Sequence, residues 1–505
     1  MPYFYDSHCH MMNLSHPNLT AIIKRTFNDL KRNQLKRYIL YFKVSLVVIF
    51  LVIPVSVIAL LVTEQYDFIK WSFYFVSAIM LLFFVFLMVK FFNPESREKT
   101  VSQMMDKIKE KLSNVMNLLA IMETDIGDCL IQMEEDLRDS FSLNSGLIMN
   151  GDGEKNEYEK IVLTPLIMDF GLKEYGEEKA SFEPRLGPIA LNEKIKSKHP
   201  YKVRWKPIVA QVEDLCIGIR DYYVHRDKYI EGHPQPLFQI IPFMGINTQN
   251  YSMKDHSEGG GVSMKLEDIL EDNFGEFKND LTPHQRRKSI DAIEWEKFNG
   301  NIESIGSHYF LGIKVYPPLG FDPWPEAGFE REKVCYLYQF CINNNIPITA
   351  HCSPGGFLVK KAYKEFSSPY KWESVLKKYS KLRLNLAHFG GVERSEWRKK
   401  IADMILEVDP KNGQYIYSNF YTDISYQGVD EKSYDKLKRF LDGYDRMSRR
   451  RLVERIIFGT DFMINLQDIN AYSAYLDYFF KTGTLTLEEK DMLCNKNAER
   501  FLFLG

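Results

Sequence analysis

The sequence predicts an α/β fold, a (β/α)8 TIM barrel with a two-helix transmembrane hairpin inserted after strand 1. Eight short strand-like runs alternate with helical patterns, as the strands and helices of such a barrel do. Residues that commonly bind metals lie at or near the ends of five of these runs. Two long uncharged segments separate the first run from the second. The length of 505 residues accommodates one large barrel with insertions.

The first strand-like run is Tyr-Phe-Tyr-Asp-Ser-His-Cys-His at residues 3–10. Because alternate residues of a strand point to the same face, His8 and His10 can bind one ion while Cys9 points the other way. A chance His-x-His pair is the alternative, so the metal interpretation depends on the later runs.

Two later runs share one design. Each is apolar, ends in a histidine and leads into a glycine turn: residues 346–351 end in His351, and residues 382–388 end in His388. A lone histidine in such a position is usually a core residue. These two are 37 residues apart, the length of one strand-helix-strand unit, and the repetition favours metal ligands.

Asp461 ends another apolar run, at residues 455–461. A helix N-cap is the alternative role for this aspartate, because a helical pattern follows it. The interval of 73 residues from His388 is about twice the previous one, so Asp461 lies where two further strands would place it. The spacing therefore favours a ligand.

Lys314 lies on a buried-looking run at residues 310–318, again 37 residues before His351. An ammonium group beside a metal ion would repel the ion. A lysine that faces the site must therefore be neutral, carboxylated by carbon dioxide into an anionic ligand, or held away from the ion.

The other strands are predicted from sequence pattern alone. Three further runs bring the number of strands to eight: residues 160–169, 237–246 and 415–424. Helical patterns separate most of the strands, at residues 330–344, 370–380, 395–407 and 431–441.

These motifs together resemble the amidohydrolase superfamily, metal-dependent hydrolases and decarboxylases on a (β/α)8 barrel, and in particular its amidohydrolase-related (amidohydrolase 2) branch. The resemblance covers residues 1–10 and most of 155–505, including a terminal helix at 497–502. It implies that six residues on strands one, four, five, six and eight bind metal: His8, His10, Lys314, His351, His388 and Asp461. Residues 11–155 have no counterpart in the family's usual barrel.

The resemblance also implies the chemistry. A divalent ion would polarise a carbonyl and activate a water, and Asp461 would be both ligand and base. If Lys314 is carboxylated it would bridge two ions, with His351 and His388 on the second. If it is not, one ion would suffice, and His388 would orient the carbonyl or the water. Zinc is the first expectation, and manganese and iron are the alternatives.

The two uncharged segments, residues 44–62 and 71–89, are each 19 residues long and could span a bilayer. Buried core helices are the alternative. Residues 24–43 carry seven lysines and arginines against one aspartate, which places both flanks of this hairpin in the cytoplasm. If the first strand shares a metal with the later ones, both parts of the barrel lie on one side of the membrane.

The predicted organisation has five parts. They are a first strand at 1–10, a basic cytoplasmic segment at 11–43, the hairpin at 44–92, a helical connector and linker at 93–158, and the rest of the barrel at 159–505. The apolar spacing from 100 to 140 predicts one long helix that either pairs with another subunit in a homo-oligomer or packs on the barrel. Residues 142–158 are predicted to be a loop or linker.

Two insertions, residues 170–236 and 248–308, are expected to shape the substrate pocket. The first carries cations that could meet an anionic substrate or simply be solvated: Arg185, Arg204 and Lys206, beside Trp205. The net charge of −2 gives no indication of a nucleic-acid partner. Seven cysteines without paired spacing fit a reducing compartment.

The sequence therefore predicts an integral membrane protein whose termini and barrel are cytoplasmic. Its expected function is that of a metal-dependent hydrolase, with water attacking a C–N or C–O bond of a small substrate. The alternatives are a metal-dependent decarboxylase of the same superfamily and a non-catalytic membrane scaffold or sensor.

Overall fold

The computed structural model describes residues 2–13, 116–141, 147–150, 155–170, 208–254, 265–279, 282–306, 309–326, 328–391 and 395–504, with 113, 114 and 143. The chain divides into two units, one formed by Met1–Ala21 with Asn117–Gly505 and the other by Ile22–Met116. The first strand therefore belongs to the same unit as the rest of the barrel. Almost all of the second unit lies outside the described residues.

Nine short strands of the described residues run parallel to one another around the centre of the first unit. They are β1 (Phe4–Cys9), β4 (Ile161–Pro165), β5 (Phe238–Ile240), β6 (Phe243–Gly245), β7 (Gly312–Val315), β8 (Ile348–His351), β9 (Leu384–Ala387), β10 (Phe420–Asp423) and β11 (Ile456–Ile457). Each pairs with its neighbours in the orders β1-β4-β5 and β11-β10-β9-β8-β7-β6. β5 and β6 occupy one position in the ring, and Pro242 between them has no N–H to continue the ladder.

Backbone hydrogen bonds join the two sheets into a closed ring. Ile167 N donates to Phe243 O at 3.0 Å, which links the strand segment after β4 to β6. On the other side, Ser7 N donates to Phe458 O and Thr460 N donates to His8 O, both at 3.1 Å, which links β1 to the end of β11. The ring thus has eight strand positions, as the sequence predicted.

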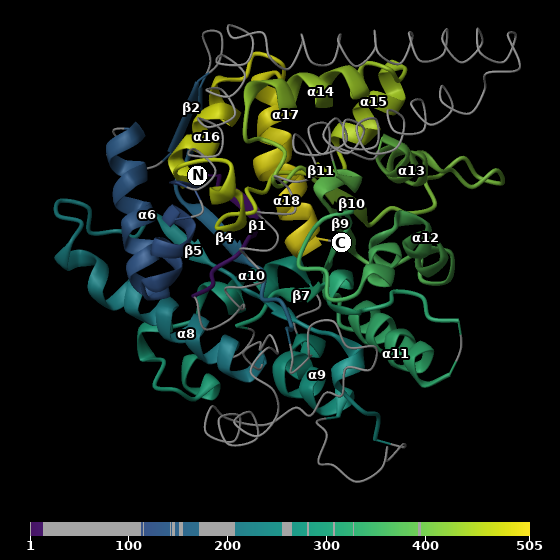
Figure 1. Cartoon of the computed structure of the whole chain (residues 1–505), viewed down its shortest axis with the longest axis horizontal. Coiled ribbons are helices and arrows are strands. Elements are labelled where there is room, and N and C mark those ends of the chain that lie inside the picture. The colour runs from purple at the N-terminus through teal and green to yellow at the C-terminus, as the bar shows by residue number, and fades with distance from the viewer. Residues whose placement is uncertain are drawn as a thin grey trace, which may run out of the picture. The chain divides into compact units, whose positions relative to one another are not determined.

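Helices surround the strands (Figure 1). Their bounds are α6 (Ile126–Phe141), α8 (Ile208–His225), α9 (Leu266–Phe274), α10 (Pro283–Asp291), α11 (Phe329–Asn343), α12 (Pro369–Lys378), α13 (Ser395–Leu406), α14 (Glu431–Leu441), α15 (Arg446–Val453), α16 (Tyr472–Lys481), α17 (Leu487–Asp491) and α18 (Asn497–Glu499). Side-chain caps start several of them. Thr282 forms a capping box with Gln285 at α10, and Asp430 accepts from Ser433 N at α14. The four helices predicted from apolar spacing are all present.

The segment predicted to be a linker contains a β-hairpin, so that prediction was wrong. β2 (Leu147–Asn150) pairs antiparallel with β3 (Lys155–Tyr158). Leu147 and Met149 are buried and Ile148 between them is 41% exposed, the alternation of a strand with one covered face. The many asparagines and glycines of the segment obscured this short alternation.

The helical connector is also different from the prediction of one continuous helix. Among its described residues, Thr124 and Asp125 interrupt the helix before α6 begins. α6 packs on α8, where Gly127 and Gly218 leave no room for a Cβ between the two helices. The fully buried Glu134 accepts from Arg226 Nη2 and Arg138 Nε, both at 2.8 Å. The connector thus packs on the barrel's own surface, one of the two arrangements expected.

The predicted hairpin at 44–62 and 71–89 lies outside the described residues, and so does its basic flank at 24–43. Across the part of the chain that the structure describes, no helix has both the length and the apolar character that a membrane span requires. The cationic cluster of the first pocket insertion, at 185–206, lies outside the described residues too.

Candidate metal centre

All six predicted ligand residues meet at the C-terminal end of the strand ring. Three of the residues lie on strands β1, β7 and β8, and three lie just after β1, β9 and β11. Each is at most 6% exposed: His8, Lys314 and His351 on the strands, and His10, His388 and Asp461 after them. Parallel strands in a closed ring present their C-terminal ends at one face, which is why residues so far apart in sequence converge.

One oxygen of Asp461 lies between the two histidines of β1. Its Oδ1 is 3.2 Å from His10 Nε2 and 3.4 Å from His8 Nε2. These three residues form one of two groups in the described residues whose ligand atoms all lie within 4.8 Å of one another. Two imidazoles and a carboxylate are a donor set that suits a divalent transition metal.

The other two histidines form a pair beside this group. His351 Nδ1 is 3.0 Å from His388 Nε2, and the His388 and His8 rings have centroids 4.9 Å apart. Four imidazoles therefore surround one small buried volume.

Each of the four imidazoles has an acceptor oxygen at the ring nitrogen that faces away from the others. The pairs are His8 Nδ1 with Asp423 Oδ2 at 2.9 Å, His10 Nδ1 with Leu166 O at 2.7 Å, His351 Nε2 with Gly355 O at 3.2 Å, and His388 Nδ1 with Ser425 O at 3.2 Å. A carbonyl or carboxylate oxygen only accepts, so we assign the proton of each ring to this outer nitrogen. The inner nitrogen then keeps its lone pair for a ligand bond.

The inner nitrogens of His351 and His388 show whether the residues fit a metal ion. With both outer nitrogens protonated, no hydrogen is left between His351 Nδ1 and His388 Nε2, so two lone pairs face each other at 3.0 Å. A cation shared by the two nitrogens would turn this repulsion into attraction. The donor set therefore fits a bound cation.

Burial keeps three of the imidazoles neutral, which is the form that binds metals. It lowers the pKa of His8 to about 3, and the charge of Lys314 acts in the same direction. Burial likewise lowers the pKa of His351 and of His388.

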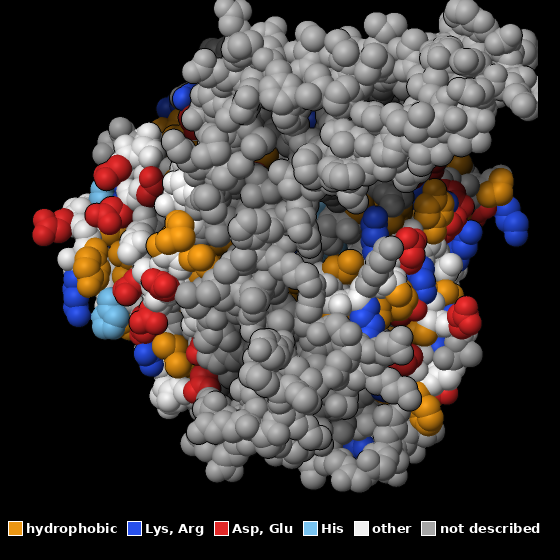
Figure 2. All heavy atoms as spheres, viewed as in Figure 1, with side chains coloured by type: hydrophobic (Ala, Val, Ile, Leu, Met, Phe, Trp, Pro, Cys, Tyr) orange, Lys and Arg blue, Asp and Glu red, His pale blue; other side chains and the backbone are white. Residues whose placement is uncertain are grey.

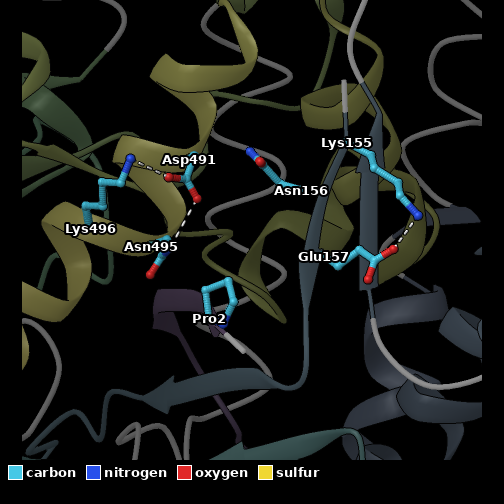
Figure 3. A pocket seen from close by; sticks show the side chains of 7 residues that line it. All are labelled: Pro2, Lys155, Asn156, Glu157, Asp491, Asn495 and Lys496. Carbon is cyan, nitrogen blue, oxygen red and sulfur yellow. Dashed lines mark hydrogen bonds and ion pairs between the residues drawn. The ribbon is translucent and has the colours of Figure 1, made fainter. Parts of the chain in front are cut away.

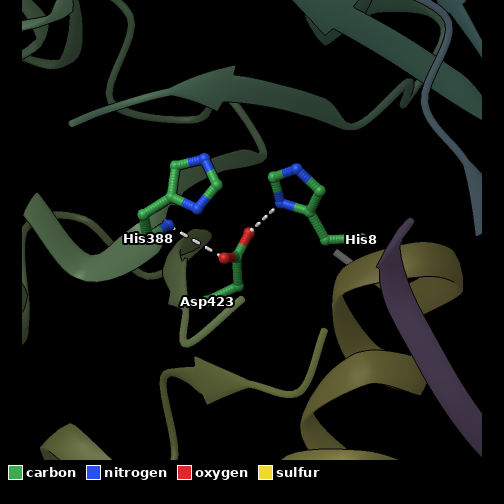
Figure 4. A group of neighbouring side chains, drawn as sticks. All are labelled: His8, His388 and Asp423. Atoms are coloured by element: carbon green, nitrogen blue, oxygen red, sulfur yellow. Dashed lines mark hydrogen bonds and ion pairs between the residues drawn. The ribbon is translucent and has the colours of Figure 1, made fainter. Parts of the chain in front are cut away.

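Asp423, at the end of β10, is a site residue that the sequence reasoning missed. Besides His8, its carboxylate accepts from Asn385 Nδ2 at 2.7 Å, His388 N at 2.9 Å and Ser425 N at 3.1 Å. It forms the second close group with His8 and His388 (Figure 4). Its lone pairs are engaged by these donors, so it orients the two histidines rather than binding an ion. Its position at the end of a predicted strand was the available signal.

Lys314 points into the same volume. Its Nζ is 3.3 Å from His8 Nε2 and the side chain is 1% exposed. Burial lowers its pKa to about 8, although the charges of Asp423 and Asp461 act in the opposite direction. A larger fraction of neutral amine at physiological pH makes carboxylation by carbon dioxide more accessible.

Two of the predicted ligand residues adopt left-handed backbone conformations. His388 has a φ of 64° and Asp461 a φ of 60°. Such a conformation costs a residue with a Cβ about 1–2 kcal/mol, so surrounding contacts must hold it in place. Gly390 and Gly391 continue the turn after His388 with φ of 74° and 81°.

A hollow of about 640 Å³ at the opposite end of the ring is separate from this centre (Figure 3). It is lined by Pro2, which precedes β1, whereas His8 and His10 end that strand. Its Lys496 and Asp491 pair with each other at 2.9 Å. Over the described part of the face in Figure 2, acidic, basic and hydrophobic side chains are interspersed.

Comparison with known proteins supports the resemblance. Residues 301–504 match the family model described as amidohydrolase. The match includes four of the six site residues, Lys314, His351, His388 and Asp461. No curated protein matches the chain.

Several solved structures are similar to the chain at low scores. An uncharacterised TIM-barrel protein from Bordetella bronchiseptica is 18% identical, with 38% of this chain and 57% of that chain covered and a TM-score of 0.26. 5-Carboxyvanillate decarboxylase from Novosphingobium aromaticivorans is 9% identical over 69% and 77%, with a TM-score of 0.33. 4-Oxalomesaconate hydratase from Rhodopseudomonas palustris is 11% identical over 75% and 83%, with a TM-score of 0.35. These scores carry no argument about function.

Replacing Asp423 with asparagine is expected to weaken divalent-metal binding about 10- to 100-fold, the usual effect of losing a partner that orients a histidine ligand. The amide can accept at one oxygen only, so its NH2 group would face either the donor on His8 or the donors near His388. Competition with a chromophoric chelator measures the affinity. Asp491→Asn, at the far end of the barrel, is the matched control, and equal affinity of Asp423→Asn and the control would contradict the assigned role.

Proposed function

We propose that this chain is a metal-dependent hydrolase of the amidohydrolase family, acting on a C–N or C–O bond of a small molecule. One observation carries the proposal: an acceptor oxygen lies at the outer nitrogen of each of four imidazoles, which leaves the inner nitrogens to a ligand in one buried volume next to the Asp461 carboxylate. The family match over residues 301–504 supports it.

In this proposal His8, His10 and Asp461 hold one divalent ion, with zinc as the first expectation and manganese and iron as alternatives. His351 and His388 hold a second ion if Lys314 is carboxylated. If Lys314 stays an amine, His351 joins the first ion and His388 is free to contact the substrate. When bound, the ion would polarise the scissile carbonyl and make a water acidic enough to attack it.

Asp461 would transfer protons during the reaction, and His388 would orient the water. Asp461 accepts a proton from the attacking water and returns it to the leaving nitrogen or oxygen, so that water is added across the broken bond. His388 donates its Nδ1 hydrogen to Ser425 O, which leaves Nε2 as an acceptor at the site. In the single-ion arrangement, where His388 binds no metal, that acceptor can hold the water's second hydrogen and so orient the attack.

We further propose that residues 44–92 anchor the enzyme in a membrane, with the barrel and both termini in the cytoplasm. The two uncharged segments and the excess of lysine and arginine beside them support this. The described part of the chain is consistent with it, because β1 and the later strands share one unit.

Elemental analysis of the purified protein is the first test of the metal proposal. About two ions per chain, falling when Lys314 is replaced by alanine, would indicate a carboxylated bridge. One ion, unaffected by Lys314→Ala, would indicate a single-ion centre. A His8→Ala variant should lose metal in either case, and a wild-type protein without metal would contradict the proposal.

The Asp461→Asn variant tests catalysis. We expect it to lower kcat about 10²- to 10⁴-fold, because it removes the proton acceptor while keeping the shape of the side chain. Hydrolysis of a panel of lactones and cyclic amides is measured for the wild type, this variant and the distant Asp491→Asn. Undiminished turnover by Asp461→Asn would exclude the assigned role.

A decarboxylase of the same superfamily is the second candidate. A centre with one ion, in which Lys314 stays an amine 3.3 Å from His8 Nε2, would favour this reaction over a two-ion hydrolysis. Release of carbon dioxide from aromatic carboxylates, with no hydrolysis of the lactone and amide panel, would select it.

The membrane anchor predicts that the full chain remains in the membrane fraction after extraction with alkaline carbonate, whereas a chain with residues 44–92 replaced by a short polar linker is released. Two spans with apolar side chains facing lipid resist extraction, because exposing them to water is unfavourable. Immunoblotting of both fractions measures this. Release of the full chain would contradict the anchor.

A further inference from the structure

We propose that Asp6 is a positioning residue. It holds β1 and the segment after β11 together, and so keeps His8 and Asp461 in the arrangement that binds the metal. This inference rests on the proposed function. It concerns a residue that is neither a predicted ligand nor in contact with the inner nitrogens of the histidines.

Asp6 is fully buried and accepts four hydrogen bonds. Its Oδ1 accepts from Thr460 N at 3.0 Å and from His8 N at 3.3 Å. Its Oδ2 accepts from Thr460 Oγ1 at 2.6 Å and from Tyr472 OH at 3.1 Å. Three of the four donors thus belong to a ligand residue or to the residue beside one.

A carboxylate suits this position because it can accept all four hydrogen bonds. Within the described residues Asp6 has no ion pair with a lysine, arginine or histidine, and all four donors to its side chain are neutral groups. The single oxygen of an asparagine side chain could not serve all four donors, whereas a carboxylate can. The four bonds are therefore what the carboxylate provides.

These bonds hold the turn that presents Asp461. Thr460 N also donates to His8 O at 3.1 Å, and Asp461 N donates to the same oxygen at 2.7 Å. The hydroxyl of Thr460, while donating to Asp6, accepts from Phe462 N at 3.0 Å. The residues before and after Asp461 are thus tied to β1 while Asp461 itself is in the left-handed conformation.

The hydrogen bonds of Asp6 affect the proposed metal centre because they fix the distance between β1 and Asp461. His8 and His10 come from the first strand and Asp461 comes from the segment after the last, so their separation depends on how β1 meets β11. A shift of the Thr460 turn would move the carboxylate away from both imidazole nitrogens together. Ligand sets must be held within about 0.5 Å of the productive geometry to bind well.

The test compares Asp6→Asn with the wild type for zinc affinity, measured by competition with a chromophoric chelator. We expect about a 10- to 100-fold loss. The visible absorption spectrum of the cobalt-loaded protein is the second readout, because it reports the arrangement of the ligands directly. We expect it to change in Asp6→Asn.

Glu134→Gln is the matched control. It is another fully buried carboxylate with several hydrogen bonds, but it joins α6 to α8 and contacts no ligand residue. It should lower the thermal unfolding temperature and leave the zinc affinity and the cobalt spectrum of the folded protein unchanged. Thr460→Val and Thr460→Ser form a second pair, in which valine removes the hydroxyl bond to Asp6 and serine retains it.

Loss of zinc affinity in Asp6→Asn and Thr460→Val, with wild-type behaviour in Thr460→Ser and Glu134→Gln, would support the proposal. Unchanged affinity and spectrum in Asp6→Asn would overturn it, and so would an equal loss in Glu134→Gln. If Asp6→Asn does not fold, the Thr460 pair decides in the same way. A wild-type protein that binds no zinc or cobalt would instead overturn the proposed function, and the inference with it.

Discussion

The closure of the strand ring between β1 and β11 is the contact on which the rest of the structure depends. Asp461 N donates to His8 O at 2.7 Å although the two residues are at opposite ends of the chain. The same closure places Phe4 against Phe458 and Phe479, so the C-terminal helices pack beneath the first strand. Loss of the contacts between β1 and β11 would separate the Asp461 carboxylate from His8 and His10 and would expose the core beneath them.

Burial gives the centre its chemical character. Four buried imidazoles and a buried carboxylate are costly unless each polar atom has a partner. The outer nitrogens find theirs in three carbonyls and Asp423, and this fixes which nitrogen of each ring faces inward. The inner nitrogens are left to a ligand. Histidine orientation and the proposed metal binding therefore depend on the same contacts, those between the outer ring nitrogens and their acceptor oxygens.

The sequence predicted the strands and the residues at their ends, but it did not predict the contacts between side chains of different strands. Strand ends and their spacing predicted the ring and the convergence of His8 with His351, because these follow from local pattern and from the geometry of parallel strands. The orienting role of Asp423 depends on contacts with residues of other strands, and no local pattern signals these. The β2–β3 hairpin was missed because its short alternation of buried and exposed residues lies among the asparagines and glycines of that segment.

The position of the insertion has a topological consequence for the proposed anchor. β1 pairs with β4 in register from Phe4↔Ile161, so the chain leaves the ring after β1 and must return to it before β4. Residues 44–89 lie within that excursion. If they cross a membrane, they cross it an even number of times, because otherwise His8 and Asp461 could not share one centre. Two spans of 19 residues are the smallest number that satisfies this condition. The ring and the hairpin, inferred from separate features of the sequence, thus constrain each other.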